Sequence, residues 1–173
     1  MNKRQLILPD AENIFTELEK KLRPDINENV ALVGVRTGGM WLAERLHRNL
    51  SLTQPLGMLD ISFHRDDFDR IGLHPDIKPS DIPFEVAGSH IILVDDVLYT
   101  GRTIRAAMNE LFDYGRPATI RLAILVDRGG RELPISAQYI GATLDLAPDK
   151  LLSLQQGVDG KLSLGLFDKL CPE

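Results

Sequence analysis

The chain has 173 residues, 43% of them hydrophobic, which is enough for the full core of one ordinary domain. Its formal net charge of -5 excludes a general binder of polyanions, since affinity for a phosphate backbone depends on clustered lysine and arginine. A single cysteine, Cys171, excludes an intramolecular disulfide. We therefore expect one domain over residues 1–173 in a reducing cytoplasm, and no apolar run is long enough to predict a membrane span.

Strand and helix patterns alternate along the first three quarters of the chain. An amphipathic helix is predicted over residues 10–22, with Asp10 as its N-cap and Pro24 preventing continuation. Strands are predicted at 30–35, 58–63, 90–94 and 120–126. A tight loop is predicted at 36–39, followed by a helix that contains Leu42 to Leu50, and a further helix is predicted at 103–114. This order predicts an α/β fold with a mainly parallel central sheet flanked by helices.

Two segments depart from that alternation. Residues 64–88 mix charges and prolines with little periodicity, and loops of that length are typical of functional lids, so a flexible lid is predicted there; a surface excursion is the alternative. Residues 151–167 contain two apolar runs around Gly157 to Gly160, which predicts an antiparallel C-terminal hairpin at a sheet edge or in a small hood.

Ligands of parallel sheets bind beyond the carboxyl ends of the strands, which directs attention to residues 36–39, 95–103 and 127–131. The run VDDVLYTGRT at 94–103 suits a sugar phosphate. Backbone N–H groups at a helix start bind phosphate, a glycine permits close approach, and paired carboxylates accept hydrogen bonds from a ribose diol. The alternative is an ordinary helix cap and an ion pair.

The same ten residues resemble the 5-phosphoribosyl-1-pyrophosphate (PRPP) signature of the type I phosphoribosyltransferases. Three further segments are similar to matching parts of the PyrR family: VGVRTGG at 33–39, DISFHRDD at 60–67 and VDRGGRELPI at 126–135. That family combines a pyrimidine-operon RNA regulator with uracil phosphoribosyltransferase activity. The resemblance implies a type I phosphoribosyltransferase core with a small hood.

The resemblance also implies roles for individual residues. The ribose and 5-phosphate of PRPP would meet Asp95, Asp96, Val97, Leu98, Tyr99, Thr100, Gly101, Arg102 and Thr103. Pyrophosphate would be bound by Arg36, Thr37 and Gly38. The lid would contribute Arg65, Asp66 and Asp67, and the base would contact Val126, Asp127 and Arg128. Arg131 would contact substrate or RNA. Asp95, Asp96 and Arg65 are the expected catalytic residues. The family tends to have arginine where Gly38 stands, which predicts an altered affinity for pyrophosphate.

The implied reaction converts uracil and PRPP into UMP and pyrophosphate. Charge develops on the departing pyrophosphate, so its stabilisation matters most. Mg²⁺ held mainly by substrate oxygens is expected to supply it, without a dedicated protein metal cage. A homodimer or higher homo-oligomer is expected from the resemblance alone.

Two alternatives remain open at this stage. A hypoxanthine or guanine phosphoribosyltransferase is one, although such enzymes typically carry an aspartate where Tyr99 stands, and tyrosine is less suited to accept a purine proton. A UMP-sensing RNA attenuator that binds an mRNA leader is the other. Its expected basic footprint is weak: residues 10–22 carry Glu12, Glu17 and Glu19 against Lys20 and Lys21, and Gly130 and Ser136 stand where basic residues are expected.

Overall fold

The computed structural model of the chain describes residues 7–61 and 79–169. Within these residues, a parallel five-stranded sheet has the order β2-β1-β3-β4-β5. Its strands are β1 (Val30–Val35), β2 (Gly57–Leu59), β3 (His90–Leu98), β4 (Thr119–Asp127) and β5 (Tyr139–Thr143). All four neighbouring pairs run parallel, which confirms the predicted α/β class.

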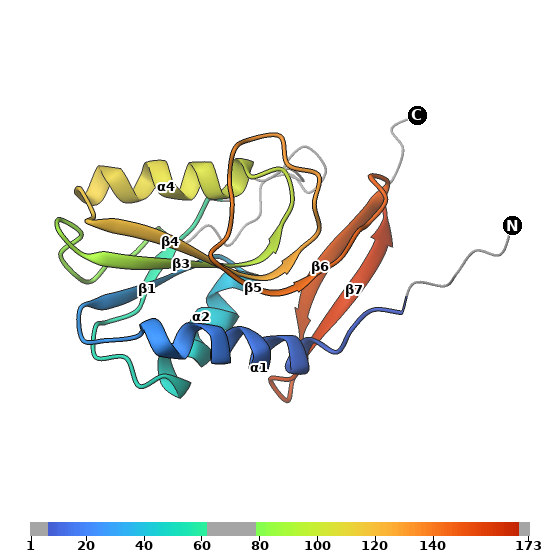
Figure 1. Cartoon of the computed structure of the whole chain (residues 1–173), viewed down its shortest axis with the longest axis horizontal. Helices are drawn as coiled ribbons and strands as arrows, with labels where there is room; N and C mark the ends of the chain where they lie inside the picture. Colours follow the sequence, from blue (N-terminus) through green and yellow to red (C-terminus); the bar gives the residue numbers. More distant parts are fainter. Residues whose placement is uncertain (1–6, 62–78, 170–173) are drawn as a thin grey trace, which may run out of the picture.

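Helices cover both faces of the sheet (Figure 1). The helix α4 (Arg102–Tyr114) lies on one face, and α1 (Ala11–Leu22) and α2 (Gly38–Asn49) lie on the other. Adjacent strand residues therefore enter different hydrophobic clusters: Leu32 packs with the α1 and α2 side, and Val33 with the α4 side. Burial on both faces explains the uninterrupted apolar runs of the central strands.

The first helix forms where the sequence predicts it. The Asp10 side chain accepts a hydrogen bond of 2.9 Å from the backbone N–H of Asn13, which satisfies one of the donors left free at a helix start. Ile14, Leu18 and Leu22 are buried at helical spacing. The helix ends at Leu22 and gives way to a short 3-10 turn, η1 (Arg23–Asp25), that contains Pro24.

Several predicted boundaries of helices and strands were wrong. The strand predicted at 90–94 continues to Leu98, because its pairing with β4 runs on to Leu98 opposite Asp127. The helix α2 begins at Gly38, inside the predicted loop at 36–39. Of the strand predicted at 58–63, Met58 and Leu59 belong to β2, residues 60 and 61 do not continue it, and residues 62 and 63 lie outside the described ranges. The strand β5 was not predicted, since its central Gly141 weakens the strand pattern.

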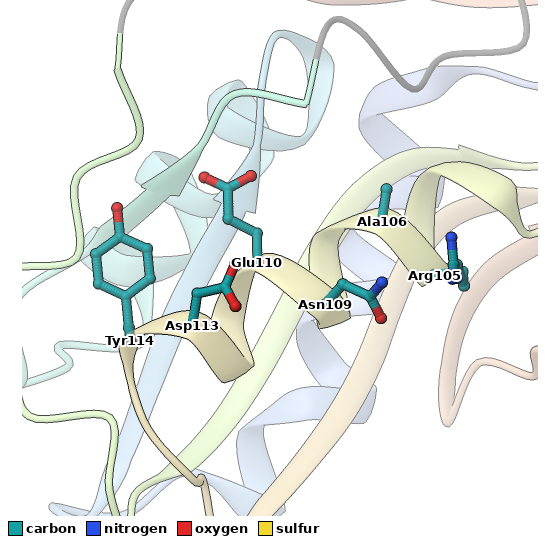
Figure 2. Close-up of a pocket in the computed structure, with 6 residues that line it drawn as sticks. All are labelled: Arg105, Ala106, Asn109, Glu110, Asp113 and Tyr114. Atoms are coloured by element: carbon teal, nitrogen blue, oxygen red, sulfur yellow. The ribbon is translucent and has the colours of Figure 1, made fainter.

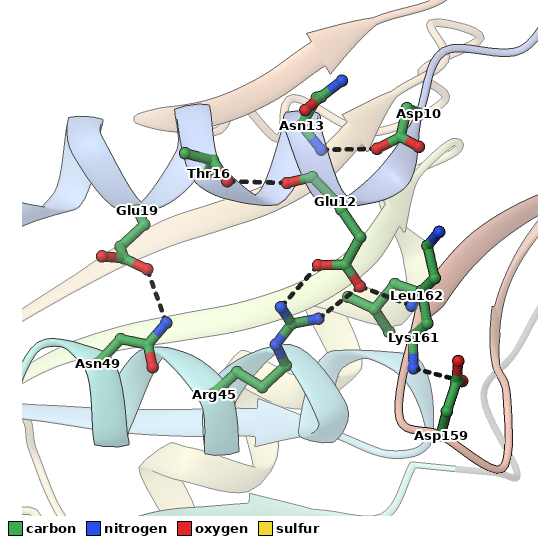
Figure 3. A network of polar contacts seen from close by, with 10 residues as sticks. All are labelled: Asp10, Glu12, Asn13, Thr16, Glu19, Arg45, Asn49, Asp159, Lys161 and Leu162. Carbon is green, nitrogen blue, oxygen red and sulfur yellow. Dashed lines mark hydrogen bonds and ion pairs between the residues drawn. The ribbon is translucent and has the colours of Figure 1, made fainter.

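The predicted C-terminal hairpin is confirmed. Strands β6 (Lys150–Gln156) and β7 (Leu162–Asp168) pair antiparallel and form a sheet of their own. Figure 3 shows how the hairpin is attached to the core: Glu12 of α1 accepts two hydrogen bonds from Arg45 of α2, at 3.0 and 2.7 Å, and one of 2.7 Å from the backbone N–H of Leu162. One carboxylate thus joins two helices to the hairpin.

Part of the predicted lid is held to the sheet. In the range 79–88, the backbone of Asp81 exchanges two hydrogen bonds with Met58, at 2.7 and 2.8 Å, and Val86 is buried. The rest of the range, residues 64–78, lies outside the described residues. None of the described helices is long and apolar enough to cross a membrane.

Candidate functional site

The three segments singled out from the sequence meet at one edge of the sheet. Because β1, β3 and β4 are parallel neighbours, residues that follow β1 and β4 lie beside the end of β3. The paired acids Asp95 and Asp96 belong to the last part of β3 rather than to the loop after it. Both are buried, with exposed fractions of 3% and 9%.

The acids are fixed partly by their own backbone. Asp95 Oδ1 accepts a hydrogen bond from the N–H of Asp96, and Asp96 Oδ1 accepts one from the N–H of Val97, each at 2.9 Å. Such local bonds orient a carboxylate while leaving it further acceptor capacity. Two carboxylates are therefore held at the edge where a ligand of this sheet would bind.

The first turn of α2 lies directly against these acids. A Cβ placed on Gly38 would lie 2.6 Å from Asp96 Cγ, and one on Gly39 would lie 2.9 Å from Asp95 Cα. An arginine at position 38, as the resemblance would favour, cannot fit beside this conformation of Asp96. Before this turn, the peptide bond between Arg36 and Thr37 is cis, and Arg36 Nε lies 4.0 Å from Asp60 Oδ2. Gly39 was not among the predicted site residues.

A short turn leads from β3 into α4. Thr100 is buried, its Oγ1 accepts a hydrogen bond of 3.2 Å from the N–H of Arg102, and Gly101 adopts a φ of 94° that favours glycine. The cap residue of α4, Gly101, has no side chain of its own to accept from the other N–H groups of this turn. The first N–H groups of a helix have no intrahelical acceptors, so this turn has the donors that an anion requires.

The segment after β4 is held back onto that turn. The backbone carbonyl of Thr100 accepts hydrogen bonds from the N–H groups of Glu132 and Leu133, at 2.9 and 3.1 Å. Arg102, a predicted phosphate ligand, forms a salt bridge of 2.8 Å with Glu132 at an exposed position. The neighbouring Thr103 is half-buried in the first turn of α4. Glu132 was not singled out from the sequence, which carries no signal for this pairing.

Arg131 bonds within the chain. Its guanidinium donates to the carbonyl of Tyr99 at 2.6 Å, to that of Ile135 at 3.1 Å and to Asp127 Oδ2 at 2.5 Å. Burial alone raises the pKa of Asp127, but the bonds from Arg131 and from the Gly129 N–H outweigh it and hold that pKa below its usual range. The predicted contact of Arg131 with substrate or RNA thus competes with an intramolecular role.

The predicted base-binding residues are also engaged. The N–H of Arg128 donates to Leu98 at 3.1 Å, and the carbonyl of Asp127 accepts from Leu144 at 2.9 Å. The Arg128 side chain is buried and donates to the carbonyls of Ala147 and Lys150, at 3.1 and 2.7 Å. Its side chain therefore ties the base of the hairpin to the end of β4.

Tyr99 is covered by two cations. Arg128 Cζ lies 4.1 Å and Lys169 Nζ 4.7 Å from the centre of its ring, and Lys169 Nζ lies 3.5 Å from its hydroxyl. A Cβ on Gly130 would lie 2.9 Å from the ring carbon Cδ2. Tyr99 thus packs against Arg128, Lys169 and Gly130. No pattern in the sequence predicts that Lys169 contacts Tyr99.

A separate pocket lies on the outer side of α4. It has a volume of about 530 Å³ and is lined by Arg105, Ala106, Asn109, Glu110, Asp113 and Tyr114 (Figure 2). Two carboxylates in that lining disfavour a phosphorylated ligand. The predicted residues Arg65, Asp66 and Asp67 lie outside the described residues. Within the described ranges, no group of three or more His, Cys, Asp and Glu side chains is placed to hold a metal ion.

Comparison with known proteins defines the class. Residues 5–149 match the phosphoribosyl transferase domain family, so the chain is a phosphoribosyltransferase. It is 55% identical to the bifunctional protein PyrR of Nitrosococcus oceani over 82% of this chain and 81% of that protein. With that of Pseudomonas putida it shares 57% identity over 85% of this chain and 88% of the relative. The chain belongs to the PyrR family.

Solved structures with low sequence identity share the fold. A hypoxanthine-guanine phosphoribosyltransferase from Bacillus anthracis superposes with a TM-score of 0.64 at 18% identity, covering 85% of this chain and 86% of that one. A hypoxanthine phosphoribosyltransferase from Staphylococcus aureus gives 0.62 at 20% identity, covering 88% and 86%. The predicted type I phosphoribosyltransferase fold is confirmed.

Proposed function

We propose that the chain transfers the phosphoribosyl group of PRPP to uracil, forming UMP and pyrophosphate. The observation that carries this proposal is the arrangement of Asp95 and Asp96 at the end of β3, beside the glycine cap at the start of α4 and against the first turn of α2. Carboxylates for a diol and the N–H groups of a helix start for a phosphate are the groups that a ribose 5-phosphate requires. Membership of the PyrR family supports uracil as the base.

Each segment has a distinct task in this proposal. Asp95 and Asp96 accept hydrogen bonds from the ribose hydroxyls, while the backbone of residues 99–103 and the Thr100 hydroxyl bind the 5-phosphate. Arg36 and the start of α2 face the pyrophosphate. A base nitrogen attacks C1 of the ribose as the bond from C1 to the pyrophosphate oxygen breaks, so groups that meet the departing charge stabilise the transition state.

The residues fit a magnesium ion bound together with PRPP. Mg²⁺ binds through one or two carboxylates plus substrate phosphates, and Asp95 and Asp96 present carboxylate oxygens at this edge of the sheet. The ion would neutralise charge on the pyrophosphate. The protein residues would hold the sugar and fix the direction in which the pyrophosphate departs.

The position of Tyr99 favours a pyrimidine over a 6-oxopurine. Arg128 and Lys169 both contact its ring, so it is a packing residue and is poorly placed to take a proton from a purine. A hypoxanthine or guanine phosphoribosyltransferase would need another proton acceptor. An assay of uracil against hypoxanthine and guanine, each with PRPP and Mg²⁺, separates these substrates; formation of IMP in preference to UMP would overturn the choice of base.

The acids supply the first test. Replacing both, as D95N/D96N, is expected to lower kcat/KM for PRPP on the order of 100-fold or more, since two acceptors for the ribose hydroxyls are weakened. The substitutions keep the shape of the side chains, so circular dichroism and thermal unfolding should show an intact fold. Unchanged PRPP affinity and UMP formation in this folded variant would sink the assignment of the site.

RNA binding is the second activity that family membership raises. The surface of α1 and of the turn after it does not favour RNA binding, because Lys20 pairs with Glu17 at 2.6 Å and Arg23 pairs with Glu19 at 2.5 Å. We therefore propose phosphoribosyl transfer as the main activity of the chain and RNA binding as the less favoured one. A gel-shift with a pyrimidine-operon leader, with and without UMP and at physiological salt, tests this order; tight UMP-dependent binding would reverse it.

A further inference from the structure

Two consecutive glycines, Gly38 and Gly39, form the first turn of α2 where it touches β3. Neither has the positive φ found at Gly101, so the backbone there is open to any L-residue. What forbids a side chain is space. At each position, different neighbouring atoms occupy the space that a side chain would need. The two glycines therefore have different roles.

At Gly38 the obstacle is a side chain. An added Cβ would lie 2.6 Å from Asp96 Cγ and 3.0 Å from Asp96 Cβ, with Asp96 Oδ2 closer still. At Gly39 the obstacle is largely main chain: Asp95 Cα would lie at 2.9 Å, and the Val94 carbonyl is nearer. A substitution at 39 must therefore move a strand, whereas one at 38 must move a carboxylate.

The Asp96 carboxylate has a defined orientation. Its Oδ1 accepts the Val97 N–H at 2.9 Å, and its Oδ2 is the atom nearest to the space above Gly38. Asp96 as a whole is only 9% exposed, so surrounding atoms leave its side chain few other rotamers. A methyl group at position 38 would push Oδ2 away and alter the bond between Oδ1 and Val97.

We propose that Gly38 is a positioning residue: its missing side chain is what lets Asp96 keep the orientation that binds the ribose hydroxyls of PRPP. This inference rests on the proposed function of the site. It gives Gly38 a role toward the sugar, beyond the contact with pyrophosphate expected from the sequence. The effect acts through Asp96, so it disappears when Asp96 has no carboxylate.

A double-mutant cycle tests this directly. Gly38→Ala is expected to raise the KM for PRPP on the order of tenfold, with a smaller change in kcat, because ground-state and transition-state contacts to the diol are weakened together. Asp96→Ala is expected to cost at least as much. The double variant G38A/D96A should then be no worse than D96A alone, since the methyl group no longer has a carboxylate to displace.

Additive losses in the cycle would show that Gly38 acts elsewhere, and an unchanged KM for PRPP in Gly38→Ala would overturn the inference. Glu44→Ala, an exposed change on the same helix, is the matched control and should leave KM unaltered. Thermal unfolding of all variants checks the fold. A weaker affinity for PRPP in a chain that still unfolds in one cooperative transition is the expected combination.

Direct PRPP binding separates this inference from the choice of base. Trp41, the one tryptophan of the sequence, lies in α2 three residues after Gly38 and offers a fluorescence signal. A wild-type chain that binds PRPP but forms no UMP overturns only the uracil assignment. A Gly38→Ala chain that binds PRPP as tightly as the wild type overturns only the positioning role, and a wild type that does not bind PRPP overturns both.

Discussion

Arg131 and Asp127 illustrate how single side chains fix the edge of the site. Arg131 reaches the carbonyls of Leu98 and Tyr99, at 3.3 and 2.6 Å, as well as the Asp127 carboxylate. One guanidinium thus connects the end of β3 with the end of β4. Charge-assisted hydrogen bonds of this kind are stronger than neutral ones, so their loss should lower the free energy of unfolding.

Asp127→Asn is therefore expected to lower the free energy of unfolding by about 1–3 kcal/mol at neutral pH, since Arg131 loses an ionic acceptor. The pKa of Asp127 is lower in the folded state. Its contribution is complete above the unfolded value of about 3.9 and is lost as pH falls through the lower folded value. Urea unfolding at neutral pH and in acid measures this; a gap between wild type and variant that persists at low pH would contradict it.

At the residue scale, the sequence predicts types of chemistry better than the partners of long side chains. The acids and the glycine-containing turn lie at the carboxyl end of β3, where a ligand was expected, because spacing along one segment is a local property; the acids belong to the strand and not to the predicted loop. Arg128 and Arg131 were assigned to base and RNA or substrate, yet their guanidinium groups bond to carbonyls of residues distant in sequence. Such partners depend on tertiary contacts that no local pattern records. Roles toward ligands remain predictions.

Among the elements, the hairpin of β6 and β7 depends on Arg128 for its attachment to the parallel sheet. That side chain donates to the carbonyls of Ala147 and Lys150, and Lys169, the residue after β7, contacts Tyr99. The hairpin and the turn after β3 thus share one stacked aromatic ring. Two carbonyl acceptors and the Tyr99 ring offset the burial of this cation, although its Nε has no hydrogen-bond partner among the described residues.

Arg128→Lys should loosen this attachment, because one ammonium group cannot reach both carbonyls and stack on Tyr99 as the planar guanidinium does. We expect faster amide hydrogen exchange in β6 and β7, with α4 little changed. Exchange measured by mass spectrometry gives the comparison, and Arg105→Lys on the exposed side of α4 is the control. Equal protection of the hairpin in wild type and Arg128→Lys would refute the anchoring role.

The elements also show why boundaries are harder to predict than order. Aspartate is depleted in strands, so the sequence suggested that β3 stops at Val94, whereas pairing with β4 carries it to Leu98. The start of α2 was missed for a similar reason, because glycine at positions 38 and 39 signals a loop. In both places a tertiary neighbour outweighs local preference, and both places border the proposed site.

For the whole molecule, the carboxylate of Glu12 joins three parts of the structure. Its bonds to Arg45 and to the Leu162 N–H connect α1, α2 and β7, and the bond from Arg45 is the main cause that lowers its pKa. Arg45 also lies 4.3 Å above the Phe15 ring. Removal of this acid should therefore weaken the cohesion of all three elements together.

Glu12→Ala is expected to lower the free energy of unfolding by about 1–3 kcal/mol, since Arg45 and the Leu162 N–H lose their acceptor. Glu17→Ala, on the exposed side of the same helix, should leave it unchanged. Urea unfolding followed by circular dichroism provides both values. Identical midpoints for Glu12→Ala and the wild type would show that the junction is not energetically important.

The placement of the acids within β3 has a consequence for the loss of sugar binding on heating. Residues inside a central strand open only when the sheet itself comes apart, whereas loop residues fluctuate at far lower energy. Asp95 and Asp96 are paired through their strand with β4 and lie under the first turn of α2. Sugar binding should therefore survive warming until the cooperative melt, with no earlier, separate inactivation of the acidic pair.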